Sequence, residues 1–204
     1  MRCVAREVEQ HWDLGPADIV VCNAGVARAN WLLHLTDDEI RKSIEVNTLG
    51  YFWTIRAFLG QMLARNQGHI VANASMGSYF GDVTGSAYSA SKFAIRGLVE
   101  SAEAETMRAD KEGVKFSLLY VWYTKTDILK DLDYQSGPLS PPLLTPVESA
   151  ESMVDAILKE KREAWIPFYV SIFCTLIKSL LSTKANWTAR SFLFPKLTPK
   201  KRDS

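Results

Sequence analysis

A phenol and an amine four residues apart are the side chains best suited to chemistry. Tyr88 and Lys92 bound the run Tyr-Ser-Ala-Ser-Lys, and this spacing places both on one face of a helix. A free tyrosine ionises near pH 10, so ionisation at pH 7 requires about three pKa units, or roughly 4 kcal/mol. A neighbouring lysine cation and a hydrogen bond from Ser75, thirteen residues before Tyr88, would supply much of this shift. The spacing indicates a tyrosine that exchanges a proton with a ligand.

The bare motif also has a simpler explanation. A Tyr-x-x-x-Lys pair occurs by chance on the exposed face of many amphipathic helices, and for the motif alone this is the more frequent case. Its context favours chemistry, because the pair opens a predicted helix after a glycine-bearing loop. Ser75 also stands at the end of a predicted strand.

The elements that must position these residues alternate along the chain. Short apolar runs predict strands over residues 18–22, 68–75, 114–121 and 164–167. Helical periodicity and N-cap signals predict helices over residues 2–12, 36–66, 87–108, 145–161 and 168–182. Residues 123–144 are expected to form a loop, and the tail after residue 182 a loose segment. This alternation predicts an α/β fold with an open parallel sheet, a doubly wound Rossmann-like arrangement.

The edge of the sheet where ligands bind is also predicted. Ligands of open α/β sheets bind outside the carboxyl ends of the strands. Asn23, Ser75 and Thr126 each follow a predicted strand, so they are expected at that edge.

Composition excludes several other classes of protein. The 204 residues carry a net charge of +1 and are 47% hydrophobic, which fits one globular domain and argues against a nucleic-acid binder. The three cysteines, Cys3, Cys22 and Cys174, form no metal-ligand pattern. We therefore expect a reducing compartment, no disulfide framework and no metal site.

Asn23-Ala-Gly25, Asn47, Ser75 and Tyr88-x-x-x-Lys92 occur together in a familiar order and spacing. In these residues the chain resembles the short-chain dehydrogenase/reductases, from about residue 2 to residue 182. Tyr51-Phe-Trp-Thr54, Gly68-His-Ile-Val71 and Ser89-Ala-Ser-Lys-Phe-Ala94 are most similar to the retinol dehydrogenase and 17-beta-hydroxysteroid dehydrogenase branch.

The resemblance implies an NAD- or NADP-dependent interconversion of an apolar alcohol and its carbonyl. Tyr88 would be the general acid/base, and Ser75 would polarise the carbonyl. Lys92 would hold the ribose hydroxyls and lower the pKa of Tyr88, while Asn47 would position a water that links Lys92 to solvent.

The remaining cofactor contacts also follow from the resemblance. Asn23 and Gly25 would border the adenosine side, and Thr126 would hydrogen-bond the nicotinamide amide. Asn47, Tyr88 and Lys92 complete the expected cofactor-binding set. The residue that selects NAD or NADP is not identified. A retinoid, steroid or other lipid is the expected substrate. A membrane surface and a second copy of the chain, in a homodimer, are the other partners considered.

Two departures from the family pattern are visible. Val121-Trp122 stands where the family has Pro-Gly, so a bulky indole is expected to narrow the nicotinamide pocket. The chain also contains no G-x-G-x-x-G turn, and it begins in what would be the helix before the fourth strand. This predicts an N-terminally truncated fold over residues 1–182, an exposed apolar edge at residues 18–22, and weak binding of NADH or NADPH.

The C-terminal part has a different surface from the rest. Residues 165–204 carry a net charge of +6, whereas residues 1–164 carry −5. The uncharged run 164–177 is too short to span a bilayer. It suits a lid over an apolar pocket or a helix on a membrane surface, with residues 183–204 as a basic tail. We expect the cytosolic face of the endoplasmic reticulum or of lipid droplets, with the cytoplasm as the alternative.

Three functions are compatible with these features. The first is the oxidoreductase described above. The second is a catalytically impaired isoform or pseudoenzyme that keeps a membrane- or partner-binding surface, which Trp122 and the absent glycine-rich turn favour. The third is a non-enzymatic lipid-binding module, which only the C-terminal apolar segment favours.

Overall fold

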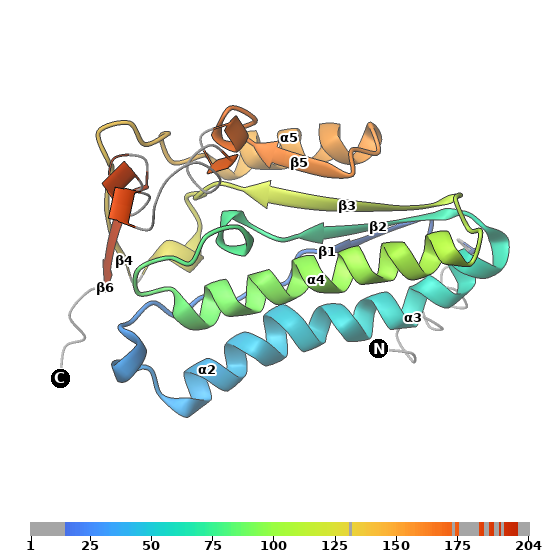
Figure 1. Ribbon diagram of the computed structural model, residues 1–204, viewed down its shortest axis with the longest axis horizontal. Helices are drawn as coiled ribbons and strands as arrows, with labels where there is room; N and C mark the ends of the chain where they lie inside the picture. Colours follow the sequence, from blue (N-terminus) through green and yellow to red (C-terminus); the bar gives the residue numbers. More distant parts are fainter. Residues whose placement is uncertain are drawn as a thin grey trace.

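A parallel sheet of four strands forms the centre of the molecule (Figure 1). The computed structural model describes residues 15–130, 132–172, 174–175, 184–185, 188–189, 192 and 194–199. Its strands are paired in the order β1-β2-β3-β5. They are β1 (Ile19–Cys22), β2 (Gly68–Asn73), β3 (Val114–Val121) and β5 (Glu163–Ile166). The predicted α/β, Rossmann-like sheet is confirmed.

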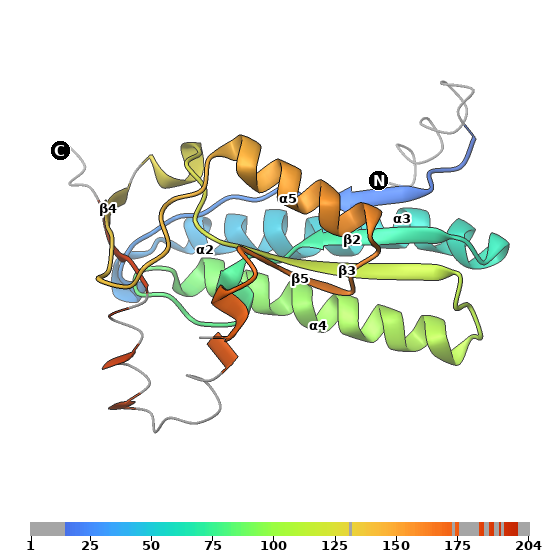
Figure 2. The ribbon, with the colours of Figure 1, turned by 90° about the horizontal axis from the view of Figure 1, so that it is seen from above.

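Helices cover both faces of this sheet (Figures 1 and 2). One face carries α3 (Gly50–Arg65) and α4 (Ser86–Arg108), with α2 (Asp37–Ile44) leading into α3. The opposite face carries α5 (Pro146–Leu158). Single helical turns lie at Leu32–His34, Met76–Ser78 and Asp127–Leu129. The predicted helix over residues 2–12 lies outside the described residues.

The two capped helices begin where local sequence signals place them. The hydroxyl of Thr36 accepts the amide of Glu39, and the Glu39 carboxylate accepts the amide of Thr36 in return. Thr145 and Glu148 form the same reciprocal pair ahead of α5. Such capping boxes satisfy backbone donors that the first helical turn leaves unpaired.

The predicted helix over residues 36–66 contains an irregular turn. Glu45–Leu49 form a π-helical turn, in which the amide of Gly50 donates to the carbonyl of Glu45, five residues earlier. A π-turn adds one residue to the helix and is common at functional sites. Asn47 lies in this turn and is fully buried.

Two apolar layers hold the helices on the sheet. The larger layer packs α3 and α4 against the strands, with Tyr51, Met62 and Ile95 almost inaccessible to solvent. The smaller layer packs Ala156 of α5 against Val71, Leu119, Val121 and Ile166. Because the central strands are buried on both faces, their sequences are continuous apolar runs rather than alternating ones.

A second, two-stranded sheet corrects two expectations from the sequence. β4 (Leu132–Gln135) pairs in antiparallel fashion with β6 (Lys196–Pro199). Residues 123–144 are therefore not loop throughout, and the tail is not loose at residues 196–199. This pairing joins segments about sixty residues apart, which local patterns cannot reveal. The small sheet lies beyond the carboxyl ends of the main strands (Figure 1).

β1 forms one edge of the main sheet. Within the described part of the chain it pairs only with β2, and its Ile19 and Val21 are 47% and 45% exposed. This agrees with the predicted apolar edge. At the C-terminal side, residues 170–172 and 174–175 are helical. The rest of the predicted helix over residues 168–182 falls largely outside the described residues.

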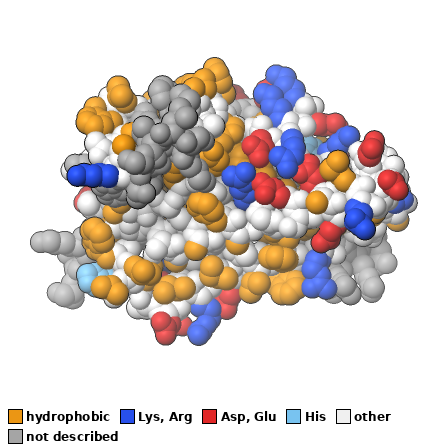
Figure 3. All heavy atoms as spheres, in the orientation of Figure 1, with side chains coloured by type: hydrophobic (Ala, Val, Ile, Leu, Met, Phe, Trp, Pro, Cys, Tyr) orange, Lys and Arg blue, Asp and Glu red, His pale blue; other side chains and the backbone are white. Residues whose placement is uncertain are grey.

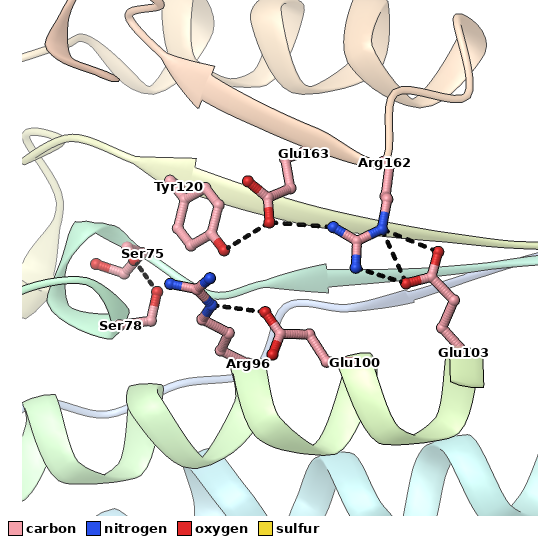
Figure 4. A network of polar contacts seen from close by, with 8 residues as sticks. All are labelled: Ser75, Ser78, Arg96, Glu100, Glu103, Tyr120, Arg162 and Glu163. Carbon is pink, nitrogen blue, oxygen red and sulfur yellow. Dashed lines mark hydrogen bonds and ion pairs between the residues drawn. The ribbon is translucent and has the colours of Figure 1, made fainter. Parts of the chain in front are cut away.

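Charged side chains connect α4 to the opposite edge strand. Arg96 bonds Glu100 on α4, while Arg162 bonds both Glu103 and Glu163 (Figure 4). The space-filling view shows acidic and basic side chains next to each other on this part of the surface (Figure 3). These ion pairs add little to the stability of the fold, since ion pairs near the surface contribute about 0–1 kcal/mol each.

Candidate active site

A cavity of about 880 Å³ opens at the carboxyl ends of β1, β2 and β3. This volume is within the range usual for small-molecule sites. Five residues predicted from the sequence line it, namely Asn23, Gly25, Ser75, Tyr88 and Thr126. The other two, Asn47 and Lys92, are buried directly beside it, because a Cβ added to Gly25 would lie 3.6 Å from both Asn47 Oδ1 and Lys92 Nζ.

Ser75 sits where the chain leaves β2. Its φ of 70° is unusual for a residue with a side chain, and such strained backbones concentrate at functional sites. The amide of Ser75 donates to the carbonyl of Leu119 on β3 at 3.1 Å. Its Oγ accepts the amide of Gly77 at 3.3 Å, so the backbone of Ser75 is held by the adjacent strand and its hydroxyl by the turn that follows.

Tyr88, in the first turn of α4, faces Ser75. Burial raises the pKa of the Tyr88 phenol, a hydrogen bond from Ser75 lowers it, and the negative charge of Asp82 raises it again. Burial is the largest of these influences, and Lys92 is not among them, so the expectation that this lysine lowers the pKa of Tyr88 is corrected: the pKa is raised. In this structure Tyr88 is therefore a neutral phenol at pH 7, which is the form that donates a proton.

Lys92 lies one turn further along α4 and is only 3% exposed. Its ammonium donates to the carbonyl of Asn73 at 2.9 Å. It also lies 5.3 Å from the ring centre of Tyr51 and 5.7 Å from that of Tyr88. Burial lowers the pKa of Lys92 to about 8, so the group is mostly cationic at pH 7.

Asn47 ties together the elements around the amine. Its Nδ2 donates to the carbonyl of Val26 and its Oδ1 accepts the amide of Val26, each at 2.8 Å. Nδ2 also donates to Ser91 Oγ on α4 at 2.9 Å. The π-turn thus places an amide that clamps the loop after β1 to the helix carrying Tyr88 and Lys92.

The predicted cofactor contacts occupy two parts of the rim. Asn73 Nδ2 donates to Asn23 Oδ1 at 2.7 Å, which fixes Asn23 at the end of β1. Thr126 is exposed, and its hydroxyl donates to the carbonyl of Thr124 at 3.3 Å. These two residues lie in different loops but face one cavity.

The sequence interpretation missed Tyr51, Asp82 and Tyr123. Tyr51 donates to the same Asn73 carbonyl as Lys92, at 3.2 Å. Its spacing of four from Asn47 was an available signal. Asp82 and Tyr123 line the cavity, and the Tyr123 hydroxyl donates to the Asp82 carboxylate. That pairing joins distant loops and has no signature in the sequence.

Trp122 forms part of the cavity wall, as expected for a bulky residue after β3. It is 3% exposed and packs against Tyr123 and Phe194, with ring centres 5.1 Å and 5.4 Å apart. Leu132 of β4 and Leu197 of β6 line the same cavity. The small sheet therefore supplies apolar side chains to the cavity wall.

The described residues offer this cavity neither a metal site nor a reactive thiol. Among the described residues, no group of three or more His, Cys, Asp and Glu side chains could hold a metal ion. Burial raises the pKa of the Cys22 thiol to about 12, which makes it a poor nucleophile. The groups equipped for chemistry are thus a serine hydroxyl, a neutral phenol and a buried ammonium.

Comparison with known proteins links this arrangement to one family. The chain matches the short chain dehydrogenase family over residues 1–136. Rat 17-beta-hydroxysteroid dehydrogenase 13 is 38% identical over 160 residues, which cover 78% of this chain and 52% of the relative. Mouse epidermal retinol dehydrogenase 2 is 31% identical over 190 residues, which cover 93% of this chain and 60% of the relative. The chain thus spans little more than half the length of these relatives.

Solved structures show the same likeness. An alcohol dehydrogenase from the archaeon Thermococcus sibiricus, complexed with 5-hydroxy-NADP, superposes with a TM-score of 0.64 at 25% identity, over 80% of this chain and 67% of that one. A gluconate 5-dehydrogenase from Burkholderia cenocepacia, in complex with NADP and tartrate, gives a TM-score of 0.59 at 29% identity, over 63% and 49% of the two chains.

Proposed function

The chain belongs to the short-chain dehydrogenase/reductase family, and from this premise we propose that it serves the interconversion of an apolar alcohol and its carbonyl, with Tyr88 as the general acid/base. The observation that carries the proposal is the convergence of Ser75 and Tyr88 on one cavity, with the ammonium of Lys92 buried directly beside it.

Each residue has a defined task in this proposal. A neutral Tyr88 donates its proton to the carbonyl oxygen of the substrate in the reducing direction and accepts it back in the oxidising direction. The Ser75 hydroxyl hydrogen-bonds the same oxygen and so stabilises the negative charge that develops there. The Lys92 ammonium, 5.7 Å from the Tyr88 ring centre, stabilises the phenolate that the proton transfer leaves behind.

The cavity suits the ribose–nicotinamide end of a dinucleotide. Gly25 lies next to Lys92, since a Cβ at this glycine would be in van der Waals contact with the ammonium, at 3.6 Å. Lys92 and Tyr88 would hold the ribose hydroxyls, with Thr126 near the nicotinamide amide. A bound nicotinamide dinucleotide supplies the hydride that the protein's own side chains lack. The gluconate 5-dehydrogenase with a similar fold was solved with NADP, while the choice between NAD and NADP stays open for this chain.

An apolar substrate suits the walls of the cavity. Trp122, Leu132 and Leu197 line one side, and Val83 and Val154 line others. Relatives are named for retinol and for 17-beta-hydroxysteroids, which are large apolar alcohols. We infer the same broad class here, a retinoid, steroid or lipid.

A second function is a catalytically impaired chain that keeps a binding surface. The observation in its favour is Trp122, which occupies the wall next to the proposed nicotinamide position. The two functions differ in one measurable property, since only the first requires turnover.

We propose the cytosolic face of the endoplasmic reticulum or lipid droplets as the location. Phe168 and Ile172 are 73% and 54% exposed in a segment that the sequence continues with a basic tail. Lys and Arg residues near anionic lipid contribute about 1 kcal/mol each. No helix in the described residues is long and apolar enough to cross a bilayer.

Flotation with liposomes of phosphatidylcholine and phosphatidylserine tests the proposed binding to a membrane surface, and protein that stays at the bottom of the gradient contradicts it. A homodimer stays a prediction of the family resemblance.

Turnover with defined probes tests the first function. The protein is mixed with NADH or NADPH and either all-trans-retinal or estrone, and absorbance at 340 nm is followed. We expect oxidation of one nucleotide, and we expect Tyr88→Phe to lose at least about 100-fold in rate with nearly unchanged nucleotide affinity.

The outcomes separate the two functions. Turnover that persists in Tyr88→Phe overturns the assignment of the general acid/base. Wild-type protein that binds the carbonyl probe but never oxidises either nucleotide supports the impaired chain instead. Ser75→Ala serves as the companion variant, since it removes the second hydrogen bond to the substrate oxygen, together with the bond from Ser75 to Tyr88, and keeps the phenol itself.

A further inference from the structure

A buried serine bonds the backbone of Ser75, and the proposed reaction does not yet use it. Ser78 is the last residue of the single helical turn Met76–Ser78, which follows β2, and its side chain is inaccessible to solvent. Its hydroxyl donates to the carbonyl of Ser75 at 2.5 Å, and its amide donates to the same carbonyl at 3.1 Å. Figure 4 shows the two serines next to each other, with the hydroxyl bond between them. Ser78 thus holds the residue that bonds the substrate oxygen in the proposed function.

The backbone of Ser75 is strained and therefore needs such support. Its φ of 70° and its ψ of 159° lie in a region that is almost confined to glycine. A residue with a side chain stays in this region only where its surroundings determine both dihedral angles. The strain predicts strong contacts on both sides of Ser75.

Hydrogen bonds hold Ser75 on both sides. Before it, the amides of Ala74 and Ser75 both donate to the carbonyl of Leu119 on β3, at 3.0 Å and 3.1 Å. After it, the carbonyl of Ser75 accepts the amide and the hydroxyl of Ser78. Because both flanking peptide groups are fixed, the direction of the Cα–Cβ bond of Ser75 is fixed as well. The Ser78 hydroxyl is the part of this support that a side-chain substitution removes, since the other donors are backbone amides.

The direction of the Ser75 side chain matters for Tyr88. The Ser75 hydroxyl hydrogen-bonds the Tyr88 side chain. Gly77, in the same turn, lies against the Tyr88 ring, because a Cβ at this glycine would be 3.0 Å from Tyr88 Cε1. All three residues line the cavity, whereas Ser78 lies behind them and does not. A displacement of the turn would therefore change how the hydroxyl and the phenol align on one substrate oxygen.

We propose that Ser78 is a positioning residue, whose hydroxyl keeps Ser75 in the strained conformation that aligns the Ser75 hydroxyl with Tyr88 and the substrate oxygen. This inference rests on the proposed function and adds to it a residue that touches neither substrate nor cofactor. A bond to the reacting oxygen strengthens as negative charge develops there, so its misalignment reduces the rate more than the affinity for substrate.

A purely structural role for Ser78 is the competing explanation. In that case its hydroxyl only stabilises the turn, and its loss lowers the free energy of unfolding without a specific effect on Tyr88. The two explanations separate in a double-mutant cycle, which measures whether one residue acts through another.

The Tyr88 phenol itself supplies the readout. The full chain is labelled with carbon-13 at Cζ of its tyrosines, Tyr88→Phe assigns the Tyr88 resonance, and spectra are recorded at pH 7 without nucleotide. We expect Ser75→Ala to shift this resonance, and Ser78→Ala to shift it in the same direction by at least about a third as much. In the Ser75→Ala background, Ser78→Ala is expected to have less than about a third of its effect in wild type, since the hydroxyl through which it acts is gone.

Ser43→Ala is the matched control. Ser43 on α2 is also inaccessible to solvent, and its hydroxyl also donates to a backbone carbonyl, that of Glu39, at 2.9 Å. It does not line the cavity, so we expect Ser43→Ala to leave the Tyr88 resonance in place. Ser78→Cys, whose thiol fills the same space as a weak donor, replaces Ser78→Ala if that variant does not fold, and we expect the same pattern from it.

Turnover with the carbonyl probes gives a second measurement. With rates referred to the folded fraction, we expect Ser78→Ala to lower kcat by roughly tenfold while KM changes by less than about twofold. Ser43→Ala is expected to keep both values, because loss of a structural bond alone changes the folded fraction and not the rate of each folded molecule.

Each result has a definite meaning. A Tyr88 resonance that Ser78→Ala leaves in place, or shifts equally with and without the Ser75 hydroxyl, overturns this inference, while turnover by wild type keeps the proposed function standing. An unchanged kcat in Ser78→Ala, or an effect of Ser43→Ala as large as that of Ser78→Ala, overturns it as well. Coupling between Ser75 and Ser78 in a protein whose turnover survives Tyr88→Phe would instead refute the proposed function and leave the orienting role of Ser78 intact.

Discussion

The ammonium of Lys92 lies 5.7 Å from the ring centre of Tyr88, one helical turn away on α4. Lys92 is only 3% exposed, and burial is the largest influence on the pKa of each group. Burial lowers the pKa of Lys92 to about 8 and raises that of Tyr88, so each is displaced towards its neutral form. At neutral pH the amine is therefore close to its pKa and near proton exchange, whereas the phenol is further from its own pKa.

The titration of Lys92 makes stability depend on pH in a defined window. In the unfolded chain the amine keeps its proton up to about pH 10.5, whereas in the folded chain it releases it near pH 8. Between these values the unfolded state binds more protons, so the free energy of unfolding rises with pH. We expect this free energy to increase by up to about 3 kcal/mol in wild type relative to Lys92→Met.

Guanidinium unfolding at several pH values checks this expectation. The buried phenols and the Cys22 thiol act in the opposite direction above pH 9, so only the difference between wild type and Lys92→Met isolates the amine. Lys115→Met, at an exposed position of β3, controls for the loss of one lysine. A difference that stays flat from pH 7.5 to pH 10.5 contradicts the burial of a charged amine.

Two neighbours of Tyr88 act on its pKa in opposite directions. Removing the charge of Asp82 in Asp82→Asn is expected to lower the pKa of Tyr88, and removing the hydrogen bond in Ser75→Ala to raise it. Tyrosinate absorption as a function of pH gives both values when Tyr88→Phe in the same background is subtracted. Shifts of the same sign in the two variants would show that these neighbours do not act as described.

Gly113 and Gly97 differ in the space around them: a Cβ at Gly113 would meet the backbone of Asn66, and a Cβ at Gly97 would meet nothing. Gly113 donates its amide to Asn66 Oδ1 at 3.1 Å, and a Cβ there would overlap the Asn66 carbonyl oxygen. Gly113→Ala is expected to lower the free energy of unfolding by about 2 kcal/mol or more. Gly97, in α4, has nothing within 4 Å of its Cβ position, so Gly97→Ala should stabilise by about 0.5–1 kcal/mol. Denaturant midpoints measure both, and equal effects would refute the contact at Gly113.

Trp122 is expected to stabilise the fold through its volume. Trp122→Ala should lower the free energy of unfolding by about 3–5 kcal/mol, since it removes a buried indole packed on Tyr123 and Phe194. The indole Nε1–H is buried and has no acceptor among the described residues, so Trp122→Phe should lose much less. A large loss in Trp122→Phe, measured by thermal unfolding, would instead reveal a hydrogen bond from the indole.

Local and periodic signals in the sequence were sufficient for much of the fold. The capping boxes at Thr36 and Thr145 predicted helix starts, because their hydrogen bonds join residues three apart. The buried runs of β2 and β3 predicted strands, and the position after β2 predicted Ser75 at the ligand-binding edge. Tyr88 was predicted from its helical spacing to Lys92 and from the family resemblance. These features depend on contacts between residues close together in the sequence, or on the parallel sheet, in which the ends of all strands that bind ligands meet at one edge.

The features that the sequence did not reveal depend on distant contacts. β4 and β6 pair across some sixty residues, and Tyr123 bonds Asp82 across forty-one. Neither segment has an apolar pattern strong enough to predict its partner. The π-turn at Asn47 was missed for another reason, since its residues have ordinary helical character and only the tertiary clamp on Val26 favours the extra residue.

That π-turn puts the two halves of the long helix out of phase. A regular α-helix advances by about 100° per residue, so the additional residue between Glu45 and Leu49 rotates α2 relative to α3 by roughly that angle. Deleting Thr48 or Leu49 would restore a uniform pitch while swinging the whole of α2, and Asn47 with it, around the helix axis. The helix would become more regular, and the amide that ties the loop after β1 to α4 would turn away from both.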